Sequence, residues 1–188
     1  MPIRHVQVGI LCTLLLFPLL ASALAPQDIT FPDRVQVGPA LLPLSGTAPL
    51  HYLKLVPVYV AGLYLPEGVL SQHVLSDVPK RLEIGYLVAI RGRDFGTGAQ
   101  PILERNQTSE EMARLQARIA RINAAYRDVQ PGDRYALTYL PGRGTELTLN
   151  RVPLVTLEGV DFAAAYFGIW LGRQPIDEGL KRALLRSR

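Results

Sequence analysis

Two polar side chains, His51 and Tyr59, lie in an otherwise apolar strand pattern that runs from His51 to Glu67. Read with the alternation of a β-strand, odd-numbered residues 51 to 65 share one mostly aliphatic face, which places both polar groups on it. An imidazole exchanges a proton near neutral pH, and a phenol donates a hydrogen bond. Such a pair can hold the polar end of a ligand or act as base and acid. Pro57 cannot donate a ladder hydrogen bond, which predicts a bulge or a sheet edge close to it.

Other common chemistries find no support in the residue patterns. Ser, His and Asp do not form a nucleophile elbow, and no glycine fingerprint opens a helix after a strand. The sequence PGRG at residues 141–144 joins two alternating strands, so we expect a hairpin turn there and not a phosphate loop. His51 and His73 stand in no ligand-spaced cluster with acids, and we expect neither a metal nor a cofactor.

The charge balance is mildly basic, with 20 Lys and Arg against 16 Asp and Glu and a net charge of +4. The arginines are scattered and no recognition motif is present, so we expect no nucleic acid partner. Arg114, Arg118 and Arg121 lie off the apolar stripe of a predicted helix. Two interpretations remain open for them, a solvated basic face and a docking surface for an anionic headgroup or membrane.

The first 23 residues have the pattern of a secretory signal peptide. Arg4 precedes an apolar run from Val6 to Leu20, and Ala21-Ser22-Ala23 supplies a small-x-small cleavage site. The uninterrupted apolar part is shorter than the roughly 20 residues of a membrane span, so we expect no stable membrane anchor. Cleavage after Ala23 leaves a single domain over residues 24–188 that contains no cysteine. The expected location is periplasmic or secreted.

Alternating and helical patterns predict the elements that position His51 and Tyr59. Strands are expected at residues 34–37, 40–44, 51–65, 81–90, 134–140, 145–149 and 152–157, and helices at 69–78, 94–106, 108–127, 161–171 and 177–185. Thr108 and Glu111 form a capping box. Trp170 is expected in the core with Phe162 and Ile169. Strands and helices without strict alternation indicate an α+β domain whose antiparallel sheet is covered on one face.

Four segments together carry a resemblance to a known family. They are VPVYVAGLYLPE, KRLEIGYL, PGRGTELTLN and DFAAAYFGIWLGRQPIDEGLKRALL. In this order they resemble the bacterial exported branch of the chalcone isomerase-like family, over nearly all of residues 28–185. The resemblance implies the open-faced β-sandwich of that family. In this fold a large antiparallel sheet wraps around a long helix, and a ligand cleft lies between the sheet and the helices.

The enzymes of this family cyclise chalcones to flavanones and line the cleft with five polar side chains. The resemblance places their arginine at His51 and their strand threonine at Tyr59. Their helix tyrosine and asparagine fall at about Phe95 and Ile102, and their last threonine at about Ile169. Every polar catalytic position has therefore changed. Since Phe95 and Ile102 donate no hydrogen bond to a developing enolate, we expect no chalcone isomerase activity.

Fatty-acid-binding relatives in the family hold the carboxylate with an arginine and a tyrosine at the first two positions. Here the tyrosine remains, and a protonated histidine can pair with a carboxylate. We favour a non-catalytic protein that binds a fatty acid or similar small amphiphile through His51, Tyr59, Phe95, Ile102 and Ile169. The alternative is an isomerase or intramolecular lyase for a non-flavonoid substrate, with His51 as base and Tyr59 as acid.

One sequence feature would discriminate between these functions, namely a second polar group inside the cleft, which would favour the enzyme. Tyr86 and Thr138 are the candidates, and both fit a structural role. An interaction module is a third possibility. The sequence does not set the oligomeric state.

Overall fold

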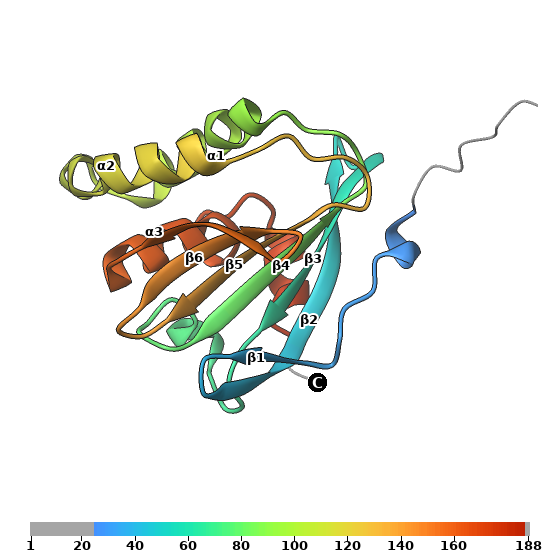
Figure 1. The fold of residues 1–188 in the computed structure, drawn as a ribbon, viewed down its shortest axis with the longest axis horizontal. Coiled ribbons are helices and arrows are strands. Elements are labelled where there is room, and N and C mark those ends of the chain that lie inside the picture. The colour runs from blue at the N-terminus through green and yellow to red at the C-terminus, as the bar shows by residue number, and fades with distance from the viewer. Residues whose placement is uncertain (1–24, 187–188) are drawn as a thin grey trace, which may run out of the picture.

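A computed structural model describes residues 25–186, which form a seven-stranded antiparallel sheet with four α-helices (Figure 1). The strands pair in chain order as β1 (Arg34–Val37), β2 (Ala40–Tyr52), β3 (Val56–Tyr64), β4 (Lys80–Tyr86), β5 (Arg134–Leu140), β6 (Gly144–Leu149) and β7 (Val152–Leu157). The helices are α1 (Gly92–Asn106), α2 (Ser109–Ala125), α3 (Val160–Leu171) and α4 (Glu178–Leu184). This confirms the α+β class and the antiparallel sheet. The signal peptide predicted over residues 1–23 lies outside the described residues.

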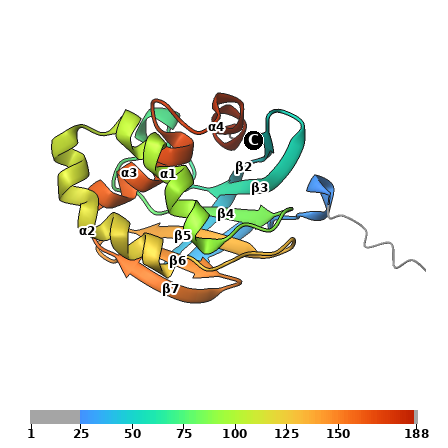
Figure 2. The ribbon, with the colours of Figure 1, turned by 90° about the horizontal axis from the view of Figure 1, so that it is seen from above.

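Helix α3 lies at the centre of the fold. Its sequence is apolar on all sides, as expected of a helix that is buried all round. Seven of its aliphatic and aromatic side chains are buried, namely Phe162, Ala163, Ala165, Tyr166, Phe167, Ile169 and Leu171. Figure 2 shows the helices gathered on one side of the sheet, which fits the single covered face expected from the sequence. No helix within residues 25–186 combines the length and apolar character needed to cross a bilayer.

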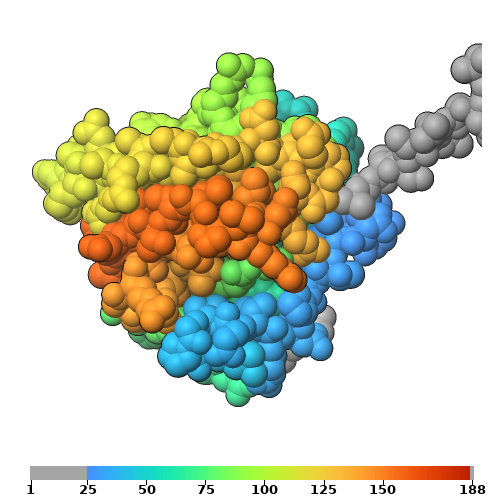
Figure 3. Space-filling model, in the orientation of Figure 1, coloured from blue at the N-terminus to red at the C-terminus, as the bar shows by residue number. Residues whose placement is uncertain are grey.

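Helix α2 begins at the predicted capping box. The Thr108 hydroxyl accepts a hydrogen bond from the Glu111 N–H at 3.2 Å, and the Glu111 carboxylate accepts one from the Thr108 N–H at 2.8 Å. Further along, Arg118 pairs with Asp161 at 2.6 Å and so ties α2 to the start of α3. Figure 3 shows the yellow residues of α2 against the orange residues of β7 and the loop that follows it. Arg118 therefore has a structural partner, which weakens the case for a docking surface built on this basic face.

The predicted strand over residues 51–65 is wrong, because the chain reverses within it. Strand β2 ends at Tyr52 and β3 starts at Val56, and the Leu55 N–H donates to the Tyr52 carbonyl at 3.1 Å. The register runs from Leu50↔Tyr59 to His51↔Pro57, which skips one residue and confirms the bulge expected near Pro57. Residues directly opposite in a ladder share a face, so the skip brings His51 to the same side as Tyr59. The two side chains therefore line the same cavity from neighbouring strands, with Tyr59 buried and His51 exposed.

The predicted helix over residues 69–78 is also wrong. Only a 3₁₀ turn forms, at Ser71–His73. The Ser76 hydroxyl donates to the His73 carbonyl at 2.6 Å, and Val74 is the only buried residue between Val69 and Val78. Local side-chain bonds and the lack of an apolar stripe leave a helix without stabilisation. The predicted strand at 81–90 likewise ends early, at Tyr86, and Ile90 makes an isolated bridge with Val129.

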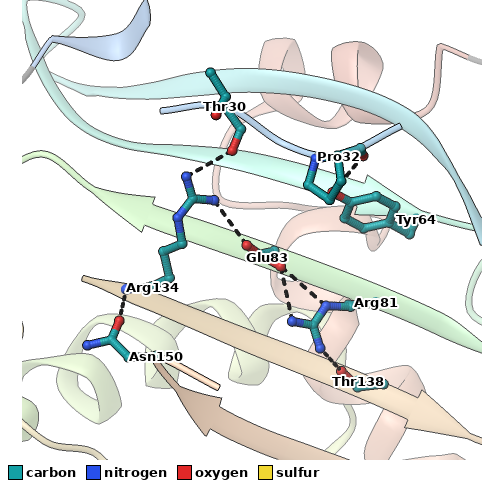
Figure 4. A network of polar contacts seen from close by, with 8 residues as sticks. All are labelled: Thr30, Pro32, Tyr64, Arg81, Glu83, Arg134, Thr138 and Asn150. Carbon is teal, nitrogen blue, oxygen red and sulfur yellow. Dashed lines mark hydrogen bonds and ion pairs between the residues drawn. The ribbon is translucent and has the colours of Figure 1, made fainter. Parts of the chain in front are cut away.

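The face of the sheet away from the helices carries an ion network and the N-terminal segment (Figure 4). Glu83 pairs with Arg81 and with Arg134, each at 3.0 Å. Arg134 also donates to the Thr30 carbonyl at 2.8 Å. The network therefore joins β4 and β5 and holds the residues before β1 against the sheet.

Helix α4 packs closely on β2 at Gly46. A Cβ atom at this position would collide with the backbone carbonyl of Ala183, so only glycine permits the contact. This contact holds the C-terminal end of α4 against the sheet. At the N-terminal end of α4, the Asp177 carboxylate accepts a hydrogen bond from the Leu180 N–H at 2.6 Å, and Asp177 lines the cavity described next.

Candidate ligand-binding cavity

A cavity of about 420 Å³ lies between the helix-covered face of the sheet and helices α1 and α3. Strands β2 to β6 contribute one wall, and the start of α4 reaches its rim. Most of the lining side chains are aliphatic or aromatic. The volume falls in the range of about 300–1,000 Å³ that is usual for small-molecule sites.

All five residues expected in the cleft line this cavity. His51 comes from β2, Tyr59 from β3, Phe95 and Ile102 from α1, and Ile169 from α3. Phe95 and Ile102 are separated by two helical turns, so both point from the same side of α1. The structure thus brings together residues far apart in the sequence. Their contact with a ligand stays a prediction.

Tyr59 and Tyr86 form a pair at the sheet wall. They are directly opposite in the register of β3 and β4, and their rings meet edge-on with centroids 6.0 Å apart. The Tyr59 hydroxyl accepts a hydrogen bond from the Trp170 indole N–H at 2.9 Å, which leaves its own hydrogen free to donate. The Tyr86 hydroxyl makes no hydrogen bond within residues 25–186. The cavity therefore presents two hydroxyl donors side by side.

Three further tyrosines complete an aromatic wall, and their hydroxyls already have partners. Tyr126 and Tyr166 bond to each other at 2.9 Å, and Tyr135 donates to the Arg127 carbonyl at 3.0 Å. Phe95 stacks on Tyr126 with centroids 4.7 Å apart. Paired hydroxyls and stacked rings hold this wall in one arrangement, which favours a preformed site.

Burial sets the protonation of these tyrosines. Desolvation raises the pKa of Tyr59, and that of Tyr86, well above the ordinary value for a phenol. Both groups therefore stay neutral at physiological pH and donate hydrogen bonds. A general acid works best with a pKa near the working pH, so Tyr59 is a poor proton donor for the enzymatic alternative.

Few charged groups line the cavity. Apart from tyrosines, its ionisable side chains are His51, Asp94 and Asp177, and no Arg or Lys of residues 25–186 belongs to the lining. Asp94 pairs with Arg91 at 3.0 Å, and Asp177 caps α4. The described part of the chain also has no group of three His, Cys, Asp or Glu that could hold a metal. His51 is thus the one lining side chain able to carry positive charge.

Thr138 has the structural role that the sequence favoured, because it lies on the opposite face of the sheet and accepts a hydrogen bond from Arg81 at 2.9 Å. The placement of Trp170 needs correction. Trp170 is half-buried and lines the cavity, whereas Phe162 and Ile169 are buried as expected. The indole N–H needs an acceptor, and Tyr59 provides it at the cavity wall. Tyr86 does line the cavity, so a second polar group is present there. Because burial raises the pKa of Tyr86 well above the ordinary value, this hydroxyl is a hydrogen-bond donor and a poor acid catalyst, and its presence does not favour the enzyme.

Comparisons with known proteins agree with this fold. The crystal structure of a fatty-acid binding protein from Arabidopsis thaliana is similar, with a TM-score of 0.64 and 13% sequence identity. The match covers 86% of this chain and 94% of that one. None of the curated proteins matches the sequence significantly. The family model described as chalcone isomerase-like matches residues 23–186, and the chain therefore belongs to the chalcone isomerase-like family.

Proposed function

We propose that this protein binds a small amphiphile, most simply a fatty acid, and does not transform it. The observation that carries the proposal is the apolar cavity of about 420 Å³ with two neighbouring tyrosine hydroxyls available to donate. The similar Arabidopsis protein, named as a fatty-acid binding protein, supports the same class of ligand.

The apolar part of such a ligand would lie against Phe95, Ile102 and Ile169, and its polar end would meet Tyr59 and Tyr86. Burial of each CH₂ group contributes about 0.8 kcal/mol, so ten of them contribute about 8 kcal/mol before the costs of binding. A hydrogen bond to a charged end adds about 1.5–3 kcal/mol. Affinity would thus come mainly from the chain, and the tyrosines would set its orientation.

Charge at the cavity makes binding of a carboxylic acid dependent on pH. Asp94 and Asp177 disfavour a carboxylate nearby, whereas a protonated His51 favours it. Histidine is the side chain whose charge responds to pH near neutrality, so a protonated His51 would strengthen binding of a carboxylate as the pH falls.

The expected test is a titration of a fluorescent fatty acid between pH 6 and pH 8. Wild type should bind more tightly at pH 6, and His51→Arg should flatten this dependence and tighten binding near pH 8, because arginine keeps its charge. Tyr86→Phe should weaken binding by about 0.5–3 kcal/mol with the fold intact, since this hydroxyl has no partner among the described residues.

Tyr139→Phe is the matched control for the loss of a hydroxyl. Its hydroxyl bonds to Asp77 and lies outside the cavity lining, so the affinity should not change. Equal curves for wild type, His51→Arg and Tyr86→Phe would show that the site is assigned wrongly. Failure of wild type to bind any fatty acid would refute the proposed function.

The same proposal includes export. The leader pattern at residues 1–23, with its small-x-small site, supports a periplasmic or secreted protein that starts at Leu24, or at Pro26 if cleavage follows Ala25. N-terminal sequencing of the protein recovered from the periplasm or medium tests this. An intact Met1 would contradict it.

A further inference from the structure

The turn between β2 and β3 exposes an unusual run of large apolar side chains. Tyr52, Leu53, Leu55 and Val56 are 64%, 74%, 82% and 51% exposed. Single exposed apolar residues are ordinary on protein surfaces, but a contiguous cluster marks a contact site for another apolar surface. Lys54 stands in the middle of the run. We call residues 52–56 the hairpin tip.

Two residues of the hairpin tip, Leu53 and Lys54, adopt a backbone conformation that is unfavourable for side chains other than Gly, Asn and Asp. Leu53 and Lys54 have φ values of 49° and 61°, which are the values of a type I′ turn. Such turns favour Asn and Gly, and the turn between β6 and β7 does place Asn150 at the equivalent position with φ 49°. Asn or Gly at these two positions would relieve the backbone strain, so the presence of Leu53 and Lys54 indicates a function for their side chains.

The hairpin tip is continuous with the mouth of the cavity. Tyr52 and Leu53 line the cavity as well as being exposed, and so does Ile176, which is 38% exposed. Basic groups accompany them: the side chains of Arg91 and Arg93 are 64% and 74% exposed, and both pair with Asp94 of the cavity lining. Two cations on one carboxylate leave a net positive charge beside the mouth. Apolar side chains mixed with cations are the combination that binds an anionic bilayer, where the former enter the interface and the latter meet phosphates.

We propose that the hairpin tip docks the protein reversibly on an anionic lipid bilayer, with the mouth of the cavity facing the membrane. Leu53 and Leu55 would enter the headgroup region, and Lys54, Arg91 and Arg93 would contact anionic headgroups. Combined with the proposed function, on which this part rests, docking lets an amphiphile move between bilayer and cavity without exposing its chain to water.

The experiment is flotation with vesicles of phosphatidylethanolamine and phosphatidylglycerol in a 3:1 ratio, compared with pure phosphatidylcholine. Wild type should bind the anionic vesicles at least about tenfold more tightly, and less so as salt rises. Leu55→Asp should lower this affinity at least about tenfold. Leu70→Asp is the matched control, because Leu70 is 60% exposed away from the cavity, and should bind as wild type does.

A double change, Leu53→Asn with Lys54→Gly, separates docking from folding. It supplies the residues that a type I′ turn favours, so the melting temperature should rise while vesicle binding falls. A rise in melting temperature with vesicle binding retained would overturn the proposal. Failure of wild type to bind anionic vesicles would also overturn it, and this includes the case in which the hairpin tip binds a soluble protein instead.

Failure of docking and failure of the proposed function are distinguishable. Leu55 does not line the cavity, so Leu55→Asp should still take up a fluorescent fatty acid from solution. Fatty-acid uptake without vesicle binding would refute docking alone. Vesicle binding without fatty-acid uptake would keep docking and refute the ligand-binding role of the cavity.

Discussion

Raising the pH above about 10.5 should unfold the protein steeply, because the tyrosines around the cavity ionise readily only in the unfolded chain. Desolvation raises the pKa of Tyr59, Tyr86, Tyr126 and Tyr166 above the ordinary value of 10.0. Their contribution to stability is complete below pH 10 and is lost as the pH rises toward the folded-state values. Each such group lowers the free energy of unfolding by about 1.4 kcal/mol per pH unit, so four lower it by about 5.6 kcal/mol per unit.

Lys80 has the opposite effect at slightly lower pH. Desolvation lowers the pKa of this buried ammonium group from 10.5 to about 8. The folded state therefore loses the proton first, and the contribution of Lys80 to stability increases between pH 8 and about 10.5. Urea unfolding from pH 7 to 11.5 should show stability that holds or rises slightly and then falls steeply. Phenolate absorbance from these tyrosines in a still-folded protein at pH 10 would contradict their burial.

Glu83→Ala should lower the free energy of unfolding by about 3 kcal/mol. The change leaves Arg81 and Arg134 without their shared carboxylate on a partly buried sheet face, and an uncompensated buried charge is costly. Glu67→Ala is the control, because its pair with Arg34 is exposed, and it should cost less than about 1 kcal/mol. Urea unfolding of both variants gives the comparison. Equal losses would mean that the network does not stabilise the sheet.

Local patterns in the sequence predicted the elements whose ends carry clear signals. The hairpins over residues 134–157 have β-strand patterns joined by a PGRG turn, and α2 has its capping box. The turn between β2 and β3 was not predicted, because Leu53 and Lys54 are not the Gly, Asn or Pro that usually mark a turn and the apolar run continues through the reversal. Periodicity within one strand contains no information on where the chain turns back.

The candidate site was predicted only in part. The resemblance supplied the five positions that line the cavity, from His51 to Ile169. The aromatic wall of Tyr126, Tyr135 and Tyr166 was missed, since which hydroxyls are paired depends on contacts between distant elements. Tyr86 could have been given more weight from the sequence, because it alternates onto the apolar face of its predicted strand.

The fluorescence of Trp170 tests the central claim, occupancy of the cavity by an amphiphile, most directly. Trp170 is the one tryptophan of the sequence, and its indole lines the cavity and donates to Tyr59. A ligand that enters must therefore change its emission.

Dodecanoic acid should be titrated at pH 6.5 into wild type, Ala99→Phe and Ala117→Phe. Ala99 lines the cavity on α1, so a phenyl ring there takes up ligand space, whereas Ala117 is exposed on α2. The account predicts a saturable change with one ligand per chain in wild type and Ala117→Phe, and at least about tenfold weaker binding in Ala99→Phe. An unchanged Trp170 emission in wild type, or equal binding by Ala99→Phe, would contradict it.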